Sequence, residues 1–322
     1  MNLPATPTLE LTAALVELGS WLKSTGYSFT TPTPATHQRV LDRPGPRHAQ
    51  SLRDIFGWSR PFHPGLLPAS VVSCMRSASL LHDGNDGLLA SRVRYSMLEG
   101  ELFAHTAYPT DQPDSVFFGP DTYRFAALIR AELERTPLTP ASRILDVGCG
   151  AGPGGIVAAR IAAAAAPALA LTDINSHALQ FAASNAALAG IEPGFALGDL
   201  FAPVDGPFDL IVANPPYLND QAGRTYRHGG GTWGGALSER IVREGVHRLA
   251  PQGRLVLYTG VAMVGGDDPF IGSLRGELDR LRWPWRYREI DPDVFGEELA
   301  LAAYANVERI AAVALVVTRE EA

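Results

Sequence analysis

The chain has 322 residues, which is enough for about two domains of ordinary size. Hydrophobic residues make up 46% of the chain and charged residues 19%, and this balance excludes a largely disordered protein. The net charge of −7 argues against a protein that coats duplex nucleic acid non-specifically.

The sequence also lacks the patterns that mark a membrane or secreted protein. No apolar run reaches the ~18 residues of a membrane span, and the N-terminal residues lack the basic and apolar regions of a signal peptide. Two cysteines, Cys74 and Cys149, cannot form a disulfide framework and belong to no metal-ligand pattern. We therefore expect a cytoplasmic protein with no membrane span and no metal site.

The N-terminal part, residues 1–110, is expected to form a small α+β domain. Apolar residues recur with a helical period over 8–24, and two shorter helices are predicted at about 50–58 and 67–80. The segment 30–48 is rich in proline, threonine and arginine and is predicted to be a loop.

A β-hairpin is predicted after these helices, with its two strands on either side of Glu99-Gly100. Helices followed by a hairpin resemble a winged-helix arrangement. Such a module either grips the substrate or caps the larger domain, and the sequence leaves both alternatives open. Residues 36–63 favour a nucleic-acid partner mildly, because they contain two aspartates and five arginines: Arg39, Arg43, Arg47, Arg53 and Arg60.

Residues 115–322 are predicted to form the larger domain. A helix is expected to begin with Asp121 or Thr122 as its N-cap. From Ser142 onward, apolar strands, glycine turns and helices alternate, which is typical of a doubly wound parallel sheet.

The predicted fold class is therefore α/β: a Rossmann-like, doubly wound sheet of seven strands, joined to the smaller N-terminal domain. The last two strands are expected at 287–293 and 311–320. An inserted helical segment is expected between them.

A glycine-rich turn follows the first strand of the larger domain. Gly148, Gly150 and Gly152 have the spacing GxGxG, which differs from the GxGxxG spacing of a dinucleotide site. An acid, Asp146, precedes the turn. A carboxylate there repels a pyrophosphate and attracts a cationic ligand, so the pattern favours S-adenosylmethionine (SAM) over NAD.

Further acids end the next two strands of the pattern. Asp173 is placed to accept hydrogen bonds from both ribose hydroxyls, and Ile174 to pack on an adenine face. Asp199 is placed to accept from the adenine amino group. Each acid alone could be an ordinary cap or turn residue, but acids at successive strand ends favour a binding site.

The fourth strand ends in Asn214-Pro215-Pro216-Tyr217. The two prolines fix the backbone and remove two N–H donors. The Asn214 side-chain oxygen and the Pro215 carbonyl are then free to accept both hydrogens of a planar –NH2 group. Tyr217 would offer a flat face on which an amide or a base can stack.

These motifs resemble the class I SAM-dependent methyltransferases with an NPPY motif. The likeness is to the HemK (PrmC) glutamine N5-methyltransferases and to the small methyltransferase domains that act on RNA bases. It covers about 115–265 well. The resemblance implies that Asp173 holds the ribose of SAM and that Asp199 with Leu200 holds the adenine. It implies that the methionine part is held by the first loop, with Asp146, Gly148, Cys149, Gly150 and Gly152.

The resemblance further implies that the acceptor nitrogen is held by Asn214 to Tyr217, with Asn214 also beside the cofactor. The acceptor is then an RNA or DNA base or a protein glutamine, with RNA slightly preferred. The helical N-terminal domain and the Pro-Arg-x-Glu-Thr stretch of HemK proteins are missing, which argues against a release-factor substrate. A small-molecule methyltransferase or another SAM-using enzyme, with the N-terminal domain as a lid, stays open as an alternative.

The segment Arg224–Gly235 combines aromatic and cationic residues with many glycines. It either closes over the substrate, with Arg227 or His228 meeting a phosphate or carboxylate, or serves as a flexible connector. A general base such as His228 is not required, because an amide or aryl amine nitrogen can lose its proton after the transfer.

Overall fold

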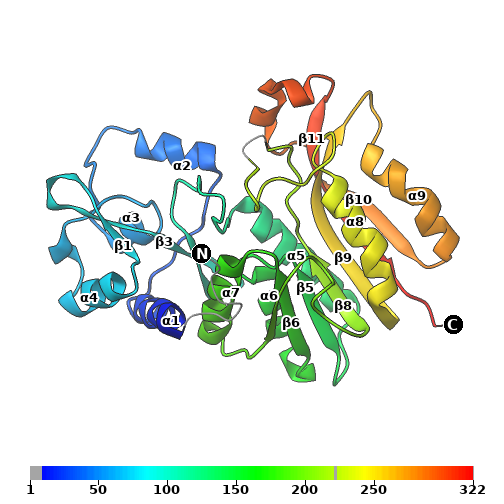
Figure 1. Ribbon diagram of the computed structural model, residues 1–322, viewed down its shortest axis with the longest axis horizontal. Coiled ribbons are helices and arrows are strands. Elements are labelled where there is room, and N and C mark those ends of the chain that lie inside the picture. Colours follow the sequence, from blue (N-terminus) through cyan, green and yellow to red (C-terminus); the bar gives the residue numbers. More distant parts are fainter. Residues whose placement is uncertain (1–8, 221–222, 322) are drawn as a thin grey trace.

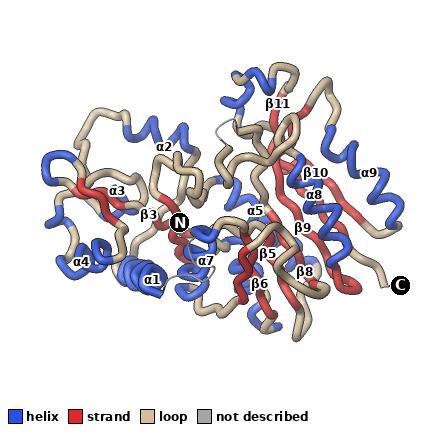
Figure 2. The backbone as a smooth tube through the Cα atoms, in the orientation of Figure 1, coloured by secondary structure: helices blue, strands red, loops and turns tan. Residues whose placement is uncertain are grey.

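The computed structural model describes residues 9–220 and 223–321. Two parts lie side by side along the longest axis of the molecule, the N-terminal part on the left and the α/β part on the right (Figure 1). Figure 2 shows that most strands gather in the α/β part, whereas helices and loops dominate the N-terminal part.

The α/β part contains a seven-stranded sheet with the order β10-β11-β9-β8-β5-β6-β7. Five neighbouring strands, from β9 to β7, run parallel, and β11 and β10 add an antiparallel edge. This topology confirms the predicted seven-stranded α/β fold. The strands are β5 (Arg143–Val147), β6 (Ala168–Asp173), β7 (Gly194–Leu197), β8 (Phe208–Ala213), β9 (Leu249–Met263), β10 (Trp285–Asp291) and β11 (Arg309–Thr318).

Helices cover both faces of this sheet, because successive residues of the buried strands point to opposite faces. Ile144 packs in a cluster with α5–α7, and its neighbour Leu145 packs in a cluster with α8 and α9. The elements are α5 (Pro120–Arg135), α6 (Pro153–Ile161), α7 (Ser176–Leu188), α8 (Ala236–Gly245) and α9 (Pro269–Leu281), with the short 3₁₀ helices η3 (Ala163–Ala165) and η4 (Val246–Arg248).

The register of the parallel strands fixes where the site can form. Val147, the last residue of β5, pairs with Ala213 at the end of β8 and with Thr172 near the end of β6. The loops that follow these three strands therefore begin next to one another, at the carboxyl edge of the sheet, where open α/β sheets bind their ligands.

Within the described ranges, the N-terminal part holds four α-helices, two short 3₁₀ helices and two small sheets. β1 pairs with β2, and β3 pairs with β4 across the predicted turn at Glu99-Gly100. The likeness to a winged helix and the boundary between residues 110 and 115 stay predictions, and residues 1–8 lie outside the described ranges. The elements are α1 (Leu9–Ser24), α2 (Pro34–Leu41), α3 (Leu52–Phe56), η1 (Pro64–Leu66), α4 (Ala69–Ser77), β1 (Leu81–Asp83), η2 (Asn85–Gly87), β2 (Leu89–Ser91), β3 (Val93–Leu98) and β4 (Glu101–Thr106).

Two local expectations are wrong. The segment 30–48 contains the helix α2, because Thr33 caps its N-terminus and Pro34 occupies the first turn, where a missing N–H costs nothing. Helix α5 begins at Pro120 with Gly119 as its N-cap, so neither Asp121 nor Thr122 is the cap. The helical segment expected before β11 is present as two short 3₁₀ helices, η5 (Gly296–Ala300) and η6 (Ala302–Tyr304).

The N-terminal part shares a hydrophobic cluster with the larger part. Ala178 and Phe181 of α7 and Ala151 of the glycine-rich loop are buried in the same cluster as the apolar residues of α1, α3 and α4. Asn185 of α7 joins the two parts by hydrogen bonds: it accepts from the Ala104 N–H (2.7 Å) and donates to the carbonyls of Ala104 (3.0 Å) and Ala151 (2.9 Å). One side chain thus ties the hairpin to the glycine-rich loop.

None of the helices within the described ranges is both long enough and apolar enough to span a bilayer.

We predict that Asn185→Ala lowers the free energy of unfolding by roughly 2–4 kcal/mol, because it leaves one buried N–H and two buried carbonyls without partners. Ser184→Ala is the matched control. Ser184 is equally buried, but its hydroxyl bonds only to Gln180 of its own helix, so a loss of about 1 kcal/mol or less is expected. Urea unfolding of both variants measures the difference, and equal losses would contradict the bridging role of Asn185.

Candidate active site

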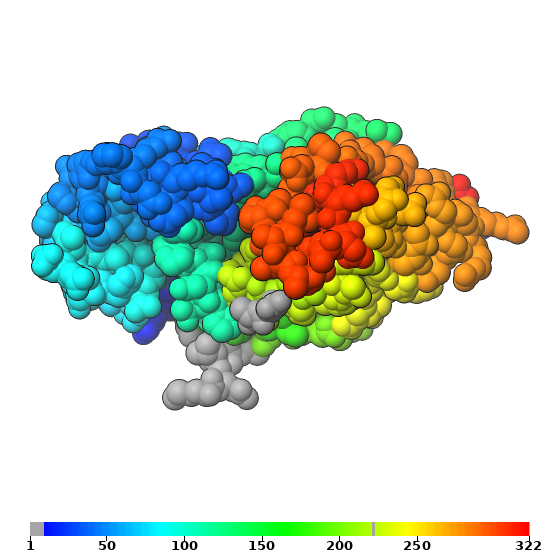
Figure 3. Space-filling view, turned by 90° about the horizontal axis from the view of Figure 1, so that it is seen from above, coloured from blue at the N-terminus to red at the C-terminus, as the bar shows by residue number. Residues whose placement is uncertain are grey.

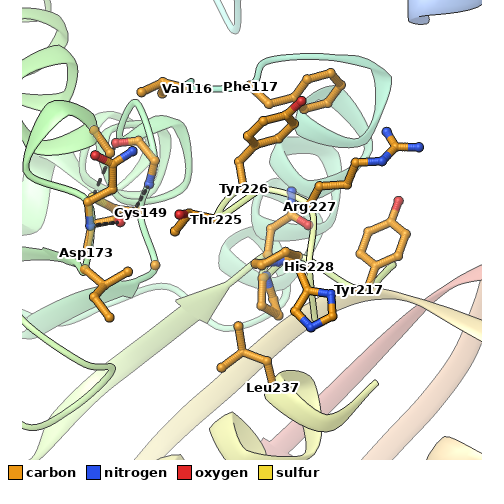
Figure 4. A pocket seen from close by; sticks show the side chains of 18 of the residues that line it. Val116, Phe117, Cys149, Asp173, Tyr217, Thr225, Tyr226, Arg227, His228 and Leu237 are labelled. Atoms are coloured by element: carbon orange, nitrogen blue, oxygen red, sulfur yellow. Dashed lines mark hydrogen bonds between the residues drawn. The ribbon is translucent and has the colours of Figure 1, made fainter. Parts of the chain in front are cut away.

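A pocket of about 350 Å³ lies at the carboxyl edge of the sheet. It is lined by the loops that follow β5, β6, β7 and β8, together with residues 115–117 and 223–228. All the site residues predicted from the sequence line it except Gly152, which lies just behind the wall as the N-cap of α6. Figure 4 shows Cys149 and Asp173 on one side of the pocket and Tyr217, Arg227 and His228 on the other.

The glycine-rich loop forms an open cradle between β5 and α6. Gly148 and Gly150 have φ values of 64° and 54°, and a Cβ on either would meet no atom within 4 Å. Glycine is favoured by this backbone conformation rather than by crowding. The loop therefore leaves the backbone at its two glycines accessible to a ligand. Cys149, which lies between them in the chain, is buried.

Asp146 is the next-to-last residue of β5, and it is buried and lines the pocket. Its carboxylate accepts a hydrogen bond from the Gly155 N–H (2.7 Å) in the first turn of α6. Its pKa is raised to about 7, chiefly by burial and also by Asp173, while the Gly155 bond opposes the rise. Within the described ranges no cationic side chain pairs with Asp146, and such a carboxylate suits a ligand that brings a positive charge.

Asp173 holds the cradle in shape. Its two carboxylate oxygens accept from the backbone N–H groups of Gly150 (2.8 Å) and Asn175 (2.8 Å). Burial raises its pKa, and these two bonds oppose the rise. Each oxygen retains a lone pair for hydroxyl groups of a ligand.

The next residue along the chain, Ile174, is 61% exposed, which is unusual for a large apolar side chain. It lines the pocket and so offers an apolar face without a packing partner. A flat ring fits such a face.

Asp199 and Leu200, which follow β7, line the same pocket. Leu200 is buried and adopts a left-handed backbone conformation (φ 48°). The carboxylate of Asp199 is half exposed and forms an ion pair with Arg240 of α8 (2.8 Å). The predicted bond from Asp199 to an adenine amino group would thus be shared with Arg240, and it stays a prediction.

Asn214 and Pro215 present acceptors that the protein does not use. Within residues 9–220 and 223–321, no hydrogen bond engages the Asn214 side chain or the Pro215 carbonyl. Both residues line the pocket directly after β8. A group that carries two N–H bonds in one plane suits this pair of acceptors.

A buried carboxylate fixes Tyr217. Asp121 accepts hydrogen bonds from the hydroxyls of Tyr217 (2.5 Å) and Tyr258 (2.6 Å) and forms an ion pair with Arg124 (3.2 Å). The Tyr217 ring lies on Gly260, where a Cβ would come within 2.2 Å of the ring. Burial raises the pKa of the Tyr217 hydroxyl, so it remains a donor. The Tyr217 ring is therefore fixed in the wall of the pocket by Asp121 and Gly260 and is not freely exposed.

The loop after NPPY closes one side of the pocket. Tyr226 stacks on Phe117, with ring centroids 5.9 Å apart and planes inclined by 11°, and its hydroxyl donates to the Thr110 carbonyl. The backbone N–H of Thr225 donates to the Pro113 carbonyl (3.3 Å). Residues 223–228 are thus attached to the segment that links the two parts of the molecule (Figure 4).

Arg227 is paired within the protein. Its guanidinium donates to Glu298 and lies 3.7 Å from Asp220. A role in meeting a substrate anion is therefore not supported for Arg227. His228 is exposed at the pocket, and in the described part of the chain its ring has no hydrogen-bond partner.

Sequence reasoning missed Asp121, Tyr258 and the pocket wall at 115–117. Asp121 follows a glycine and a proline at a helix start, a pattern that fits a helix cap equally well. Tyr258 lies in the middle of an apolar strand and carried no signal. Phe117 lies in a loop, and only the fold brings it to Tyr226.

Comparison with known proteins agrees with this geometry. Residues 126–263 match the family model of the methyltransferase small domain. The chain is 32% identical over 220 residues to the release factor glutamine methyltransferase of Deinococcus radiodurans, a match that covers 65% of this chain and 73% of that protein.

Two other relatives match over shorter stretches. The ribosomal RNA small subunit methyltransferase C of Pasteurella multocida is 37% identical over 35% of this chain and 31% of its own length. The ribosomal protein uL3 glutamine methyltransferase of Bradyrhizobium diazoefficiens is 34% identical over 38% of this chain and 42% of its own.

The pocket, the glycine cradle beside a buried acid and the matched family agree, and the expected cofactor is confirmed as SAM. The chain belongs to the class I SAM-dependent methyltransferases that carry the methyltransferase small domain.

Proposed function

We propose that this enzyme methylates a planar amino or amide nitrogen of a macromolecule, either a nucleobase or a protein glutamine. The observation that carries the proposal is the pair of unused acceptors at Asn214 and Pro215, in the same pocket as the glycine cradle. A relative that covers most of the chain is named for glutamine methylation, and a shorter match is named for ribosomal RNA methylation.

We assign the cofactor to the half of the pocket between β5 and β7. Asp173 would accept from the ribose hydroxyls, and Ile174 and Leu200 would enclose the adenine. The uncompensated carboxylate of Asp146 and the open loop at Gly148–Gly150 would hold the cationic methionine part. When bound, SAM supplies an electrophilic methyl group on a positively charged sulfur.

We assign the acceptor to the half of the pocket formed after β8. The Asn214 side-chain oxygen and the Pro215 carbonyl accept the two N–H bonds of the substrate, which orients the nitrogen lone pair toward the cofactor half. Pro216 keeps this turn rigid, and the Asp121 contact keeps Tyr217 in place as its wall. Catalysis then rests on positioning.

No side chain is needed to remove a proton before the transfer. The nitrogen becomes positively charged when it gains the methyl group, and its extra proton is then acidic enough to pass to water. This agrees with a pocket in which His228 is exposed at the rim rather than held beside Asn214.

Between the two acceptor classes we prefer RNA, because residues 36–63 contain five arginines and only two acidic residues. A protein glutamine is the second candidate, favoured by the match that covers most of the chain. A small-molecule acceptor would instead make the N-terminal part a lid over a closed pocket.

The acceptor class is tested by incubating the protein with SAM labelled at its methyl group and a cell extract divided into RNA, protein and metabolite fractions. We expect label in RNA, on a nucleobase nitrogen. Label in protein, recovered on a glutamine side chain, would favour the second candidate. Label only in the metabolite fraction, or transfer to oxygen or carbon, would overturn the proposal of a macromolecular planar nitrogen.

We predict that Asn214→Ala lowers turnover by about 10²–10³-fold while SAM affinity stays within a few fold, because Asn214 positions the acceptor more than the cofactor. Tyr217→Ala would mainly raise the KM for the acceptor, and Tyr217→Phe would have the smaller effect because it keeps the ring. The matched control is Asn219→Ala, whose side chain bonds to Thr232 of the following loop. Steady-state kinetics and SAM titration of each variant give the comparison, and near-normal turnover of Asn214→Ala would refute the assignment.

A further inference from the structure

Four exposed arginines of the N-terminal part have no anionic partner among the residues that the structure describes. Arg39, Arg43, Arg47 and Arg53 are exposed, and none of them forms an ion pair within the described ranges. We call these four residues the arginine surface. Exposed arginines elsewhere are often paired, as Arg240 is with Asp199 and Glu244.

The two aspartates of this segment do not neutralise the arginine surface. Asp54 accepts from the backbone N–H of Gln50 and the hydroxyl of Ser51, as part of the cap of α3. Asp42 accepts from the Gln38 amide. Both carboxylates keep their negative charge, but residues 36–63 contain five arginines and only these two acids, so positive charge remains in excess although the whole chain has a net charge of −7.

Hydrogen bonds hold the segments of this surface side by side. Arg60 donates to the carbonyls of Pro46 (2.7 Å) and Val40 (3.4 Å), and the Ala49 N–H donates to the Pro61 carbonyl (2.8 Å). The chain from α2 to α3 is therefore held together by hydrogen bonds and does not form separate loops. Viewed from above, it forms a blue surface toward one end of the molecule (Figure 3).

A buried cation lies behind this surface. Arg94 is 3% exposed, and within the described ranges no carboxylate pairs with it. It donates to the Thr106 carbonyl (3.3 Å) and contacts His37 Nδ1 (3.4 Å) of α2. Burial lowers its pKa to about 10, so Arg94 stays charged at neutral pH. An unpaired charge of this kind adds to the positive potential at the surface and is stabilised when an anion binds there.

Aromatic side chains pack around His37 of α2, the helix that carries Arg39. His37 contacts both Trp58 (ring centroids 5.1 Å apart) and Tyr108 (4.1 Å, stacked), and Trp58 and Tyr108 are both half-buried. Arginines beside partly exposed rings are typical of surfaces that bind single-stranded nucleic acid, where phosphates meet the cations and bases stack on the rings.

The arginine surface is connected to the pocket by the segment that joins the two parts. Tyr108 donates to Gln38 of α2 (3.0 Å), and two residues later the Thr110 carbonyl accepts from Tyr226, which lines the pocket. Phe117 of the same segment stacks on Tyr226. A chain that lies on the arginine surface can thus follow residues 108–117 to the acceptor half of the pocket.

We propose that the arginine surface is the docking site for a single-stranded RNA segment that delivers its target base to the pocket, an inference that rests on the proposed function for its biological purpose. RNA is favoured over an acidic protein segment because the surface combines cations with rings on which bases stack. The RNA backbone supplies the anions that the four arginines lack.

The test measures the affinity of the full chain for a fluorescein-labelled oligouridine at several salt concentrations. Arg43→Gln/Arg47→Gln/Arg53→Gln is expected to weaken binding by at least ~10-fold at low salt, and to reduce the slope of log affinity against log salt by about 2, because three phosphate contacts no longer release counterions. SAM affinity, measured by titration, is expected to stay unchanged.

The matched control is Arg275→Gln/Arg280→Gln/Arg282→Gln. These three arginines are exposed on or directly after α9, at the opposite end of the molecule (Figure 1), and within the described ranges none of them forms an ion pair. The control changes the net charge equally and is expected to leave affinity within about twofold.

Equal effects of the two triple variants, or RNA binding that does not depend on salt, would overturn the docking site. Tighter binding of an acidic peptide than of the RNA would overturn it in favour of a protein partner. Salt-dependent RNA binding at the arginine surface without label in RNA would leave the docking site standing and refute the RNA preference in the proposed function, so the two failures are distinguishable.

Discussion

The parallel pairing of β5 with β6 and β8 is the constraint on which the rest of the molecule depends. Parallel strands share one carboxyl edge, and the register sets Val147 beside Thr172 and Ala213. The glycine cradle, Asp173 and the NPPY turn are separated in the sequence and adjacent in space for this single reason. A shift of one residue in either pairing would move the buried faces of the strands and separate the two halves of the pocket.

Two sets of buried hydrogen bonds connect the loops at this edge of the sheet to other parts of the molecule. Asp121 holds Tyr217 from the start of α5, so the NPPY turn is fixed by a helix that directly precedes β5 in the chain. Asn185 joins the glycine-rich loop to the hairpin of the N-terminal part. Because buried polar groups are costly when unpaired, both contacts specify one relative placement of loop, turn and N-terminal part. The N-terminal part thus contributes to the shape of the pocket.

The sequence was sufficient for features whose cause is local. Strands, glycine turns and helices follow one another in a regular order along the chain, so the sheet was predictable. The acid before GxGxG and the NPPY turn are each short contiguous motifs, so most of the pocket wall was predictable as well. The helix α2 was missed because proline and threonine, which suggest a loop, also begin a helix. The pairing of Arg227 with Glu298 and of Tyr217 with Asp121 joins residues far apart in the chain, and no pattern in the sequence encodes such contacts.

The central claim is that Asp173 holds SAM at the carboxyl edge of the sheet. It is tested most directly by calorimetric titration of SAM into the full chain and its Asp173→Ala variant. Glu192→Ala, which removes an exposed acid that does not line the pocket, is the matched control. We expect Asp173→Ala to lose about 1–3 kcal/mol of SAM binding free energy, because hydrogen bonds to a charged group are lost. We expect Glu192→Ala to bind SAM as tightly as the unaltered chain does. A folded Asp173→Ala variant with unaltered SAM affinity would contradict the central claim.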